Sequence, residues 1–98
     1  MNEEYKTMVW KFLRYSWVEQ KTTEEVREEA KNLIMVVPWY QWNKRDGVEG
    51  MFYDAVYAIA FGYENTFAKK WGMHIQQENY PWYDVAAWAS KEKLEDYL

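Results

Sequence analysis

The feature that most constrains the fold is the stretch from Val48 to Phe61, which is apolar on nearly every face when drawn as a helix. The apolar residues recur at the three- and four-residue spacing of one helix face. They are Val48, Met51, Phe52, Ala55, Val56 and Ile59. An aromatic row, Tyr53, Tyr57 and Phe61, lies on another side. A strand is less favoured because the apolar positions do not alternate. Since a helix that is apolar all round belongs in an interior, we predict an all-α fold, a compact single-domain bundle of about five helices around this central helix.

Shorter helices are expected before the central one. The first covers residues 2–20, although the β-favouring residues 9–18 make a strand the competing interpretation. The second begins at Thr22 or Thr23, where Thr22 and Glu25 have the spacing of a capping box. Pro38 ends it, because the residue before a proline avoids helical geometry.

Two further helical regions are expected after the central helix. One runs from a cap at Asn65 or Thr66 to Trp71, and the other follows Pro81. Ser90 is expected to cap a final short helix. Residues 73–80 are polar and irregular, with a short strand as the alternative. No repeat or linker divides the chain, so we expect residues 1–98 to form one domain.

Composition excludes several classes of function. There is no Cys, which rules out disulfides and Cys-based zinc sites. The amino terminus is acidic and unlike a signal peptide, and no apolar run reaches the roughly 20 residues that span a bilayer. The net charge of −4 disfavours direct binding to nucleic acid, which depends on Lys and Arg. We therefore expect a cytoplasmic protein with no cofactor and no membrane contact.

The segment of residues 39–45 is the predicted partner-binding surface. It contains Trp39, Tyr40, Trp42, Lys44 and Arg45. Trp, Tyr and Arg are the residues that dominate binding hot spots, and aromatic residues make up 20% of the chain, with 7 Trp and 9 Tyr. The alternative is a lid whose two Trp rings fold onto the core.

Asp54 is the sharpest single candidate, because a carboxylate in apolar surroundings must find a partner or raise its pKa. It could contact a ligand or act as a general base. The favoured interpretation is structural, with Asp54 accepting from a Trp or Tyr or forming a salt bridge. Tyr53 and Tyr57 either pack the core, which is favoured, or line a ligand cleft or a contact with a second copy.

Catalytic and metal-binding signals are weak. His74 is the only histidine, and His74 with Glu78 supplies only two metal ligands, so no metal site is predicted. Neither Ser16 nor Ser90 lies in a nucleophile motif. The acidic residues 24–29 are expected to form the solvated face of a capped helix rather than a mimic of nucleic-acid phosphates.

Three functional hypotheses follow. The first is a non-enzymatic binding protein that acts on a protein partner, for example a phage or mobile-element inhibitor of a host defence enzyme in an anti-CRISPR-like role. The second is an oligomeric small-molecule or nucleotide-binding protein with an aromatic cleft, with Lys44 or Arg45 on phosphate. The third and weakest is an enzyme that uses Asp54. A homodimer is compatible with the first two.

Overall fold

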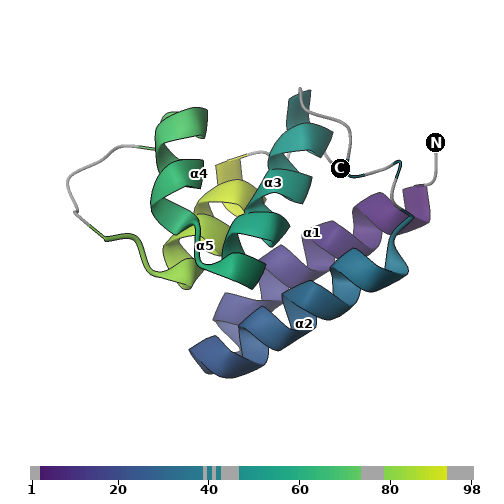
Figure 1. Ribbon diagram of the computed structural model, residues 1–98, viewed down its shortest axis with the longest axis horizontal. Coiled ribbons are helices and arrows are strands. Elements are labelled where there is room, and N and C mark those ends of the chain that lie inside the picture. Colours follow the sequence, from purple (N-terminus) through teal and green to yellow (C-terminus); the bar gives the residue numbers. More distant parts are fainter. Residues whose placement is uncertain (1–2, 39, 41, 43–46, 74–78, 93–98) are drawn as a thin grey trace.

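The computed structural model describes residues 3–38, 40, 42, 47–73 and 79–92 of the chain (Figure 1). Five helices follow one another: α1 Glu3–Val18, α2 Thr23–Val36, α3 Gly47–Phe61, α4 Glu64–Trp71 and α5 Trp82–Glu92. No strand occurs among these residues, so the all-α prediction is confirmed and the alternative of a strand over residues 9–18 is wrong. No described helix combines the length and the apolar character that crossing a membrane requires.

The centre of the molecule is α3, as its sequence predicts. It packs against each of the other four helices, and Figure 1 shows it beside α4, with α1 and α2 as a neighbouring antiparallel pair. Its buried side chains lie on several faces: Met51, Phe52, Tyr53, Ala55, Val56, Ala58, Ile59 and Ala60. The other helices contribute narrower stripes, such as Val9 and Leu13 from α1 and Val26 and Ala30 from α2. Such one-sided burial is typical of amphipathic helices that cover a central apolar one.

The start of α2 confirms the predicted capping box. The Thr22 side chain accepts a hydrogen bond from the Glu25 backbone N–H, and the Glu25 carboxylate accepts one from the Thr22 backbone N–H. These two bonds satisfy donors that a helix start leaves free. At the other end, Val37 is extended, as expected for the residue before Pro38.

Two predicted helix caps are wrong. Tyr63, rather than Asn65 or Thr66, occupies the N-cap position of α4, and it makes no side-chain cap. The Asn65 side-chain oxygen instead accepts from the Tyr80 backbone N–H at 2.8 Å, which ties the segment before α5 to α4. Ser90 starts no helix, because it lies within α5 and its hydroxyl donates to the Ala86 carbonyl four residues back. The final helix predicted after Ser90 falls on residues 93–98, outside the described residues.

An ion pair fixes the corner between α3 and α4. Gly62 ends α3 in the left-handed conformation, with φ of 77°. Arg27 of α2 donates to the Ile59 carbonyl at 2.5 Å and to the Glu64 carboxylate at 2.7 Å. Glu64 is buried, so its charge has a partner where water cannot reach it. The Glu64 partner of Arg27 lies 37 residues away in the chain, on another helix.

Candidate functional site

The predicted partner-binding segment is only partly described. Trp39, Lys44 and Arg45 lie outside the described residues, as does His74. Tyr40 is 60% exposed, so its ring is available to a partner. Trp42 is only 3% exposed, which makes its ring part of the core rather than of a free surface.

The contacts of Trp42 show what its ring does. It meets Tyr53 edge to face with ring centres 4.8 Å apart, and Tyr57 in the same way at 5.3 Å. Its Nε1–H donates to the Val37 carbonyl at 3.0 Å. Edge-to-face aromatic pairs stabilise beyond the area that they bury. Trp42 therefore covers the aromatic row of α3, the role that the lid interpretation gives it.

Asp54 accepts hydrogen bonds from side chains of α4. Its Oδ2 accepts from the Lys70 ammonium at 2.5 Å and from the Trp71 indole N–H at 3.1 Å. These bonds match the structural interpretation, an indole hydrogen bond combined with a salt bridge. Tyr53 is fully buried and Tyr57 is half-buried, so only Tyr57 of this pair reaches a hollow on the surface.

That hollow is a small aromatic cleft between α3 and α4. Its walls are Asp54, Tyr57, Ala58, Tyr63, Thr66, Phe67, Lys70 and Trp71, and its volume is about 200 Å³. Sites for drug-sized ligands span about 300–1,000 Å³. The hollow has aromatic walls, but its volume is below that of such sites.

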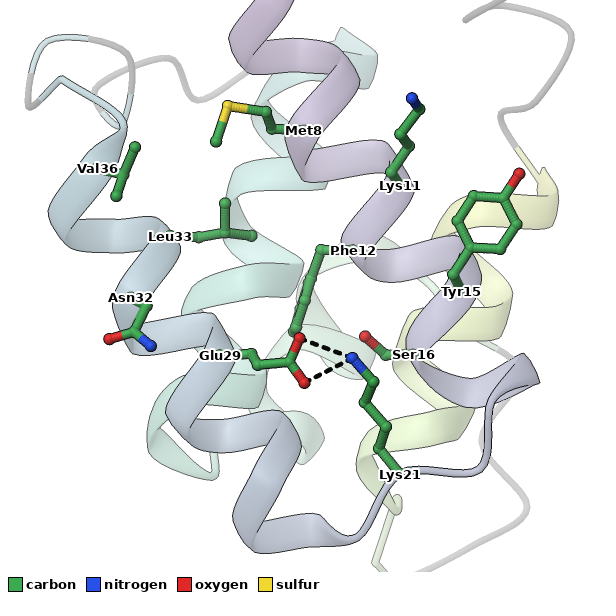
Figure 2. A pocket seen from close by; sticks show the side chains of 10 residues that line it. All are labelled: Met8, Lys11, Phe12, Tyr15, Ser16, Lys21, Glu29, Asn32, Leu33 and Val36. Carbon is green, nitrogen blue, oxygen red and sulfur yellow. Dashed lines mark hydrogen bonds and ion pairs between the residues drawn. The ribbon is translucent and has the colours of Figure 1, made fainter.

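A larger hollow lies between α1 and α2, and we call it the α1–α2 groove (Figure 2). Its volume is about 470 Å³ and it opens to solvent. The lining residues are Met8, Lys11, Phe12, Tyr15, Ser16, Lys21, Glu29, Asn32, Leu33 and Val36. Figure 2 shows the side chains of Met8, Phe12 and Leu33 in the space between the two helices. The floor is thus apolar, while polar groups stand along the rims.

An ion pair closes one end of the groove. The Lys21 ammonium donates to both carboxylate oxygens of Glu29 at 2.7 Å (Figure 2). These hydrogen bonds raise the pKa of Lys21 above its ordinary value of 10.5, so its ammonium stays charged at neutral pH. Both side chains are partly exposed, so the pair contributes at most about 1 kcal/mol to stability. The Lys21–Glu29 pair marks one end of the groove, beyond which a bound segment would not extend.

Apolar exposure continues at the opposite end of the groove. Val36 lines the groove and is 59% exposed, and the adjacent Met35 is 84% exposed. Tyr15 on the α1 rim is also exposed. Single exposed apolar residues are ordinary, but exposed apolar residues beside an apolar hollow with polar rims are typical of an interaction site. The groove is therefore the strongest candidate site in the part of the chain that the structure describes.

Sequence reasoning missed this groove, although one signal for it was present. The apolar face of residues 2–20 is broad, since Tyr5, Met8, Val9, Phe12, Leu13 and Tyr15 all fall on it. A face that wide exceeds what one neighbouring helix covers. The same holds for the end of α2, where five consecutive apolar residues precede Pro38. Excess apolar width on two neighbouring helices is the pattern that could have indicated the groove.

No group of three or more His, Cys, Asp or Glu side chains that could hold a metal ion occurs within the described ranges.

Comparison with known proteins does not assign this chain to a family. A scan against protein-family models, a search of curated proteins and a search of solved structures each found no match to this chain.

Proposed function

We propose that this chain is a small non-enzymatic binding protein that acts through a protein–protein interface, and that the α1–α2 groove is that interface. The observation that carries the proposal is the groove's construction, an open apolar floor of about 470 Å³ between polar rims. Apolar pockets that desolvate a partner's side chains supply most of the binding energy in protein complexes. We place the main contact at this groove rather than at residues 39–45, because Trp42 is buried in the core.

The chemistry of the lining agrees with binding rather than catalysis. The groove holds one carboxylate, Glu29, and that carboxylate is already bonded to Lys21. Ser16 also lines the groove, but it is buried and no His or second carboxylate stands among the lining residues to activate it. Tyr40, exposed next to the Trp42 segment, could extend the contact surface.

A matched pair of variants tests the proposal. Val36 and Val18 are each the last residue of a helix, and both are about half exposed, at 59% and 47%. Only Val36 lines the groove. Val36→Asp should weaken partner binding by about tenfold or more, because it places a charge in a contact that must lose water. Val18→Asp carries the same charge and the same unfavourable position at a helix end, and it should leave binding unchanged.

The readout uses a partner captured from the source organism by affinity purification and then purified for titration against each variant. Thermal melts establish that both variants remain folded. Equal loss of binding in the two variants, or none in either, would remove the groove from the proposal. An inhibitor of a host defence enzyme, acting in the cytoplasm, is the narrower hypothesis within this class, and inhibition of the captured partner is its direct test.

The small-molecule hypothesis has one supporting observation, the aromatic cleft at Asp54 and Lys70. Because that cleft is smaller than usual ligand sites, a nucleotide panel in thermal melts should give no stabilisation. A ligand at a hundred times its Kd would stabilise the fold by about 2.7 kcal/mol. A shift of that size would favour the small-molecule function over the protein interface.

A further inference from the structure

We infer that the partner of the α1–α2 groove is an amphipathic helix whose flank carries an acidic side chain opposite Lys11. This inference rests on the proposed function and names the chemistry of the partner. Three features support it: the shape of the groove, the backbone hydrogen bonds of the two helices that form its walls, and one lining charge that has no ion pair in the described part of the chain.

The shape of the groove favours a helix. α1 and α2 are helices of 16 and 14 residues, about 24 and 21 Å long at 1.5 Å per residue. They contribute side chains four residues apart, Met8 and Phe12, and three residues apart, Leu33 and Val36. Rows at these spacings form the ridges into which the side chains of another helix fit. A third helix lying along the trough would complete a small helical bundle.

The backbone argues against an extended peptide. Peptides that bind as added strands need the free N–H and C=O groups of a sheet edge. Both walls of the groove are helices, and the backbone groups of a helix interior bond within the helix. The affinity of an occupant must therefore come from side chains in the groove. An amphipathic helix supplies these on one face.

The charge of the groove selects an acidic flank. Lys21 and Glu29 neutralise each other, which leaves Lys11 as the excess charge of the lining. Lys11 stands exposed at the α1 rim (Figure 2), and no ion pair involves it within the described residues. The described lining of the groove thus has a formal charge of +1, on a chain whose net charge is −4. The negative net charge of the chain would attract a basic partner, whereas the ammonium of Lys11 would attract an acidic side chain to this groove.

Two synthetic peptides test the inference against the full chain. Each has 16 residues and the same row of Leu at positions i, i+3, i+4 and i+7, with either Glu or Lys on both flanks. Fluorescence anisotropy gives the Kd, and circular dichroism reports whether the bound peptide is helical. An exposed ion pair contributes up to about fivefold in affinity. The Glu peptide should bind more tightly than the Lys peptide by up to about that factor, and added salt should reduce the difference.

Variants assign the preference to Lys11. Lys11→Glu should reverse the preference between the two peptides. Lys31→Glu makes the same charge change on α2 at an exposed position outside the groove, and it should retain the preference for the Glu peptide. Val36→Asp should weaken both peptides. Equal binding of the two peptides, or a preference that Lys11→Glu leaves unchanged, would overturn the inference.

Two outcomes separate this inference from the proposed function. If neither peptide binds but Val36→Asp still abolishes binding of the captured partner, the groove is an interface and the acidic helix is wrong. Light scattering addresses the second outcome. A dimer of this chain that Val36→Asp converts to a monomer would make a second copy the occupant, and it would likewise overturn the inference.

Discussion

Removing the Trp42 ring should destabilise the fold, and this expectation follows directly from the contacts of the ring. Trp42 is nearly fully buried, and it covers Tyr53 and Tyr57 of the central helix. Trp42→Ala leaves a cavity above both tyrosines, and such truncations cost about 3–5 kcal/mol. A domain of this length has a total stability of roughly 5–15 kcal/mol. The variant should therefore lose a large fraction of its stability.

A second substitution separates the ring from its hydrogen bond. Trp42→Phe retains an aromatic ring for the edge-to-face contacts but removes the Nε1–H. The Val37 carbonyl, which accepts that N–H at 3.0 Å, then loses this partner in a buried position. An acceptor left unsatisfied in this way costs about 1–3 kcal/mol. The expected order of stability is wild type, then Trp42→Phe, then Trp42→Ala.

Urea unfolding followed by circular dichroism at the helix band measures the three free energies. In thermal melts, Trp42→Ala should lower the Tm by roughly 12–40 °C, at 4–8 °C for each kcal/mol. Tyr40→Ala is the control from the same segment, and since Tyr40 is 60% exposed it should stay within about 0.5 kcal/mol of wild type. If Trp42→Ala also stays within about 1 kcal/mol, the ring does not cover α3 and the reasoning fails.

Three other changes test local parts of the structure. Arg27→Ala leaves the buried Glu64 carboxylate without its ion pair and should lower the free energy of unfolding by about 3–5 kcal/mol, measured in urea. Adding Glu64→Gln removes the unpaired charge, so the double variant should regain most of that loss. The backbone N–H of Thr22 lowers the pKa of Glu25 below its ordinary 4.5, so the cap stabilises the fold above that pH and weakens as the pH falls through the lowered pKa. The protection of the Thr22 amide, measured relative to its intrinsic exchange rate at each pH, should fall in that acid range, and an unchanged protection factor would contradict the assignment. Gly62→Ala should lower the free energy of unfolding by about 1–2 kcal/mol through its φ of 77° alone, because an added Cβ would meet nothing closer than Arg27 at 3.9 Å. A larger loss of stability would mean that the corner is more crowded than this distance indicates.

The sequence predicted the helices because their signals are local. The central helix follows from apolar residues on all its sides, and the start of α2 follows from a cap whose two partners are three residues apart. The errors have a common cause. Asn65 and Ser90 have the side chains of helix caps, but each finds a different acceptor or donor once the chain is folded, Asn65 with Tyr80 and Ser90 with Ala86. Cap residues indicate a helix start only when no other partner, elsewhere in the fold or one turn back in the same helix, competes for the same side chain.

The candidate site could not be predicted in the same way, because it depends on which elements cover which faces. Sequence reasoning left the role of Trp42 open between a ring for a partner and a lid on the core. In the structure the Trp42 ring covers Tyr53 and Tyr57 of α3. The apolar surface that stays available to a partner lies where two helices pack on a third. α1 and α2 each direct one stripe toward α3, and between them stays a trough that neither helix fills. The proposed binding surface is thus the apolar area that the core leaves uncovered, and a sequence specifies that area only once its helix pairs are known.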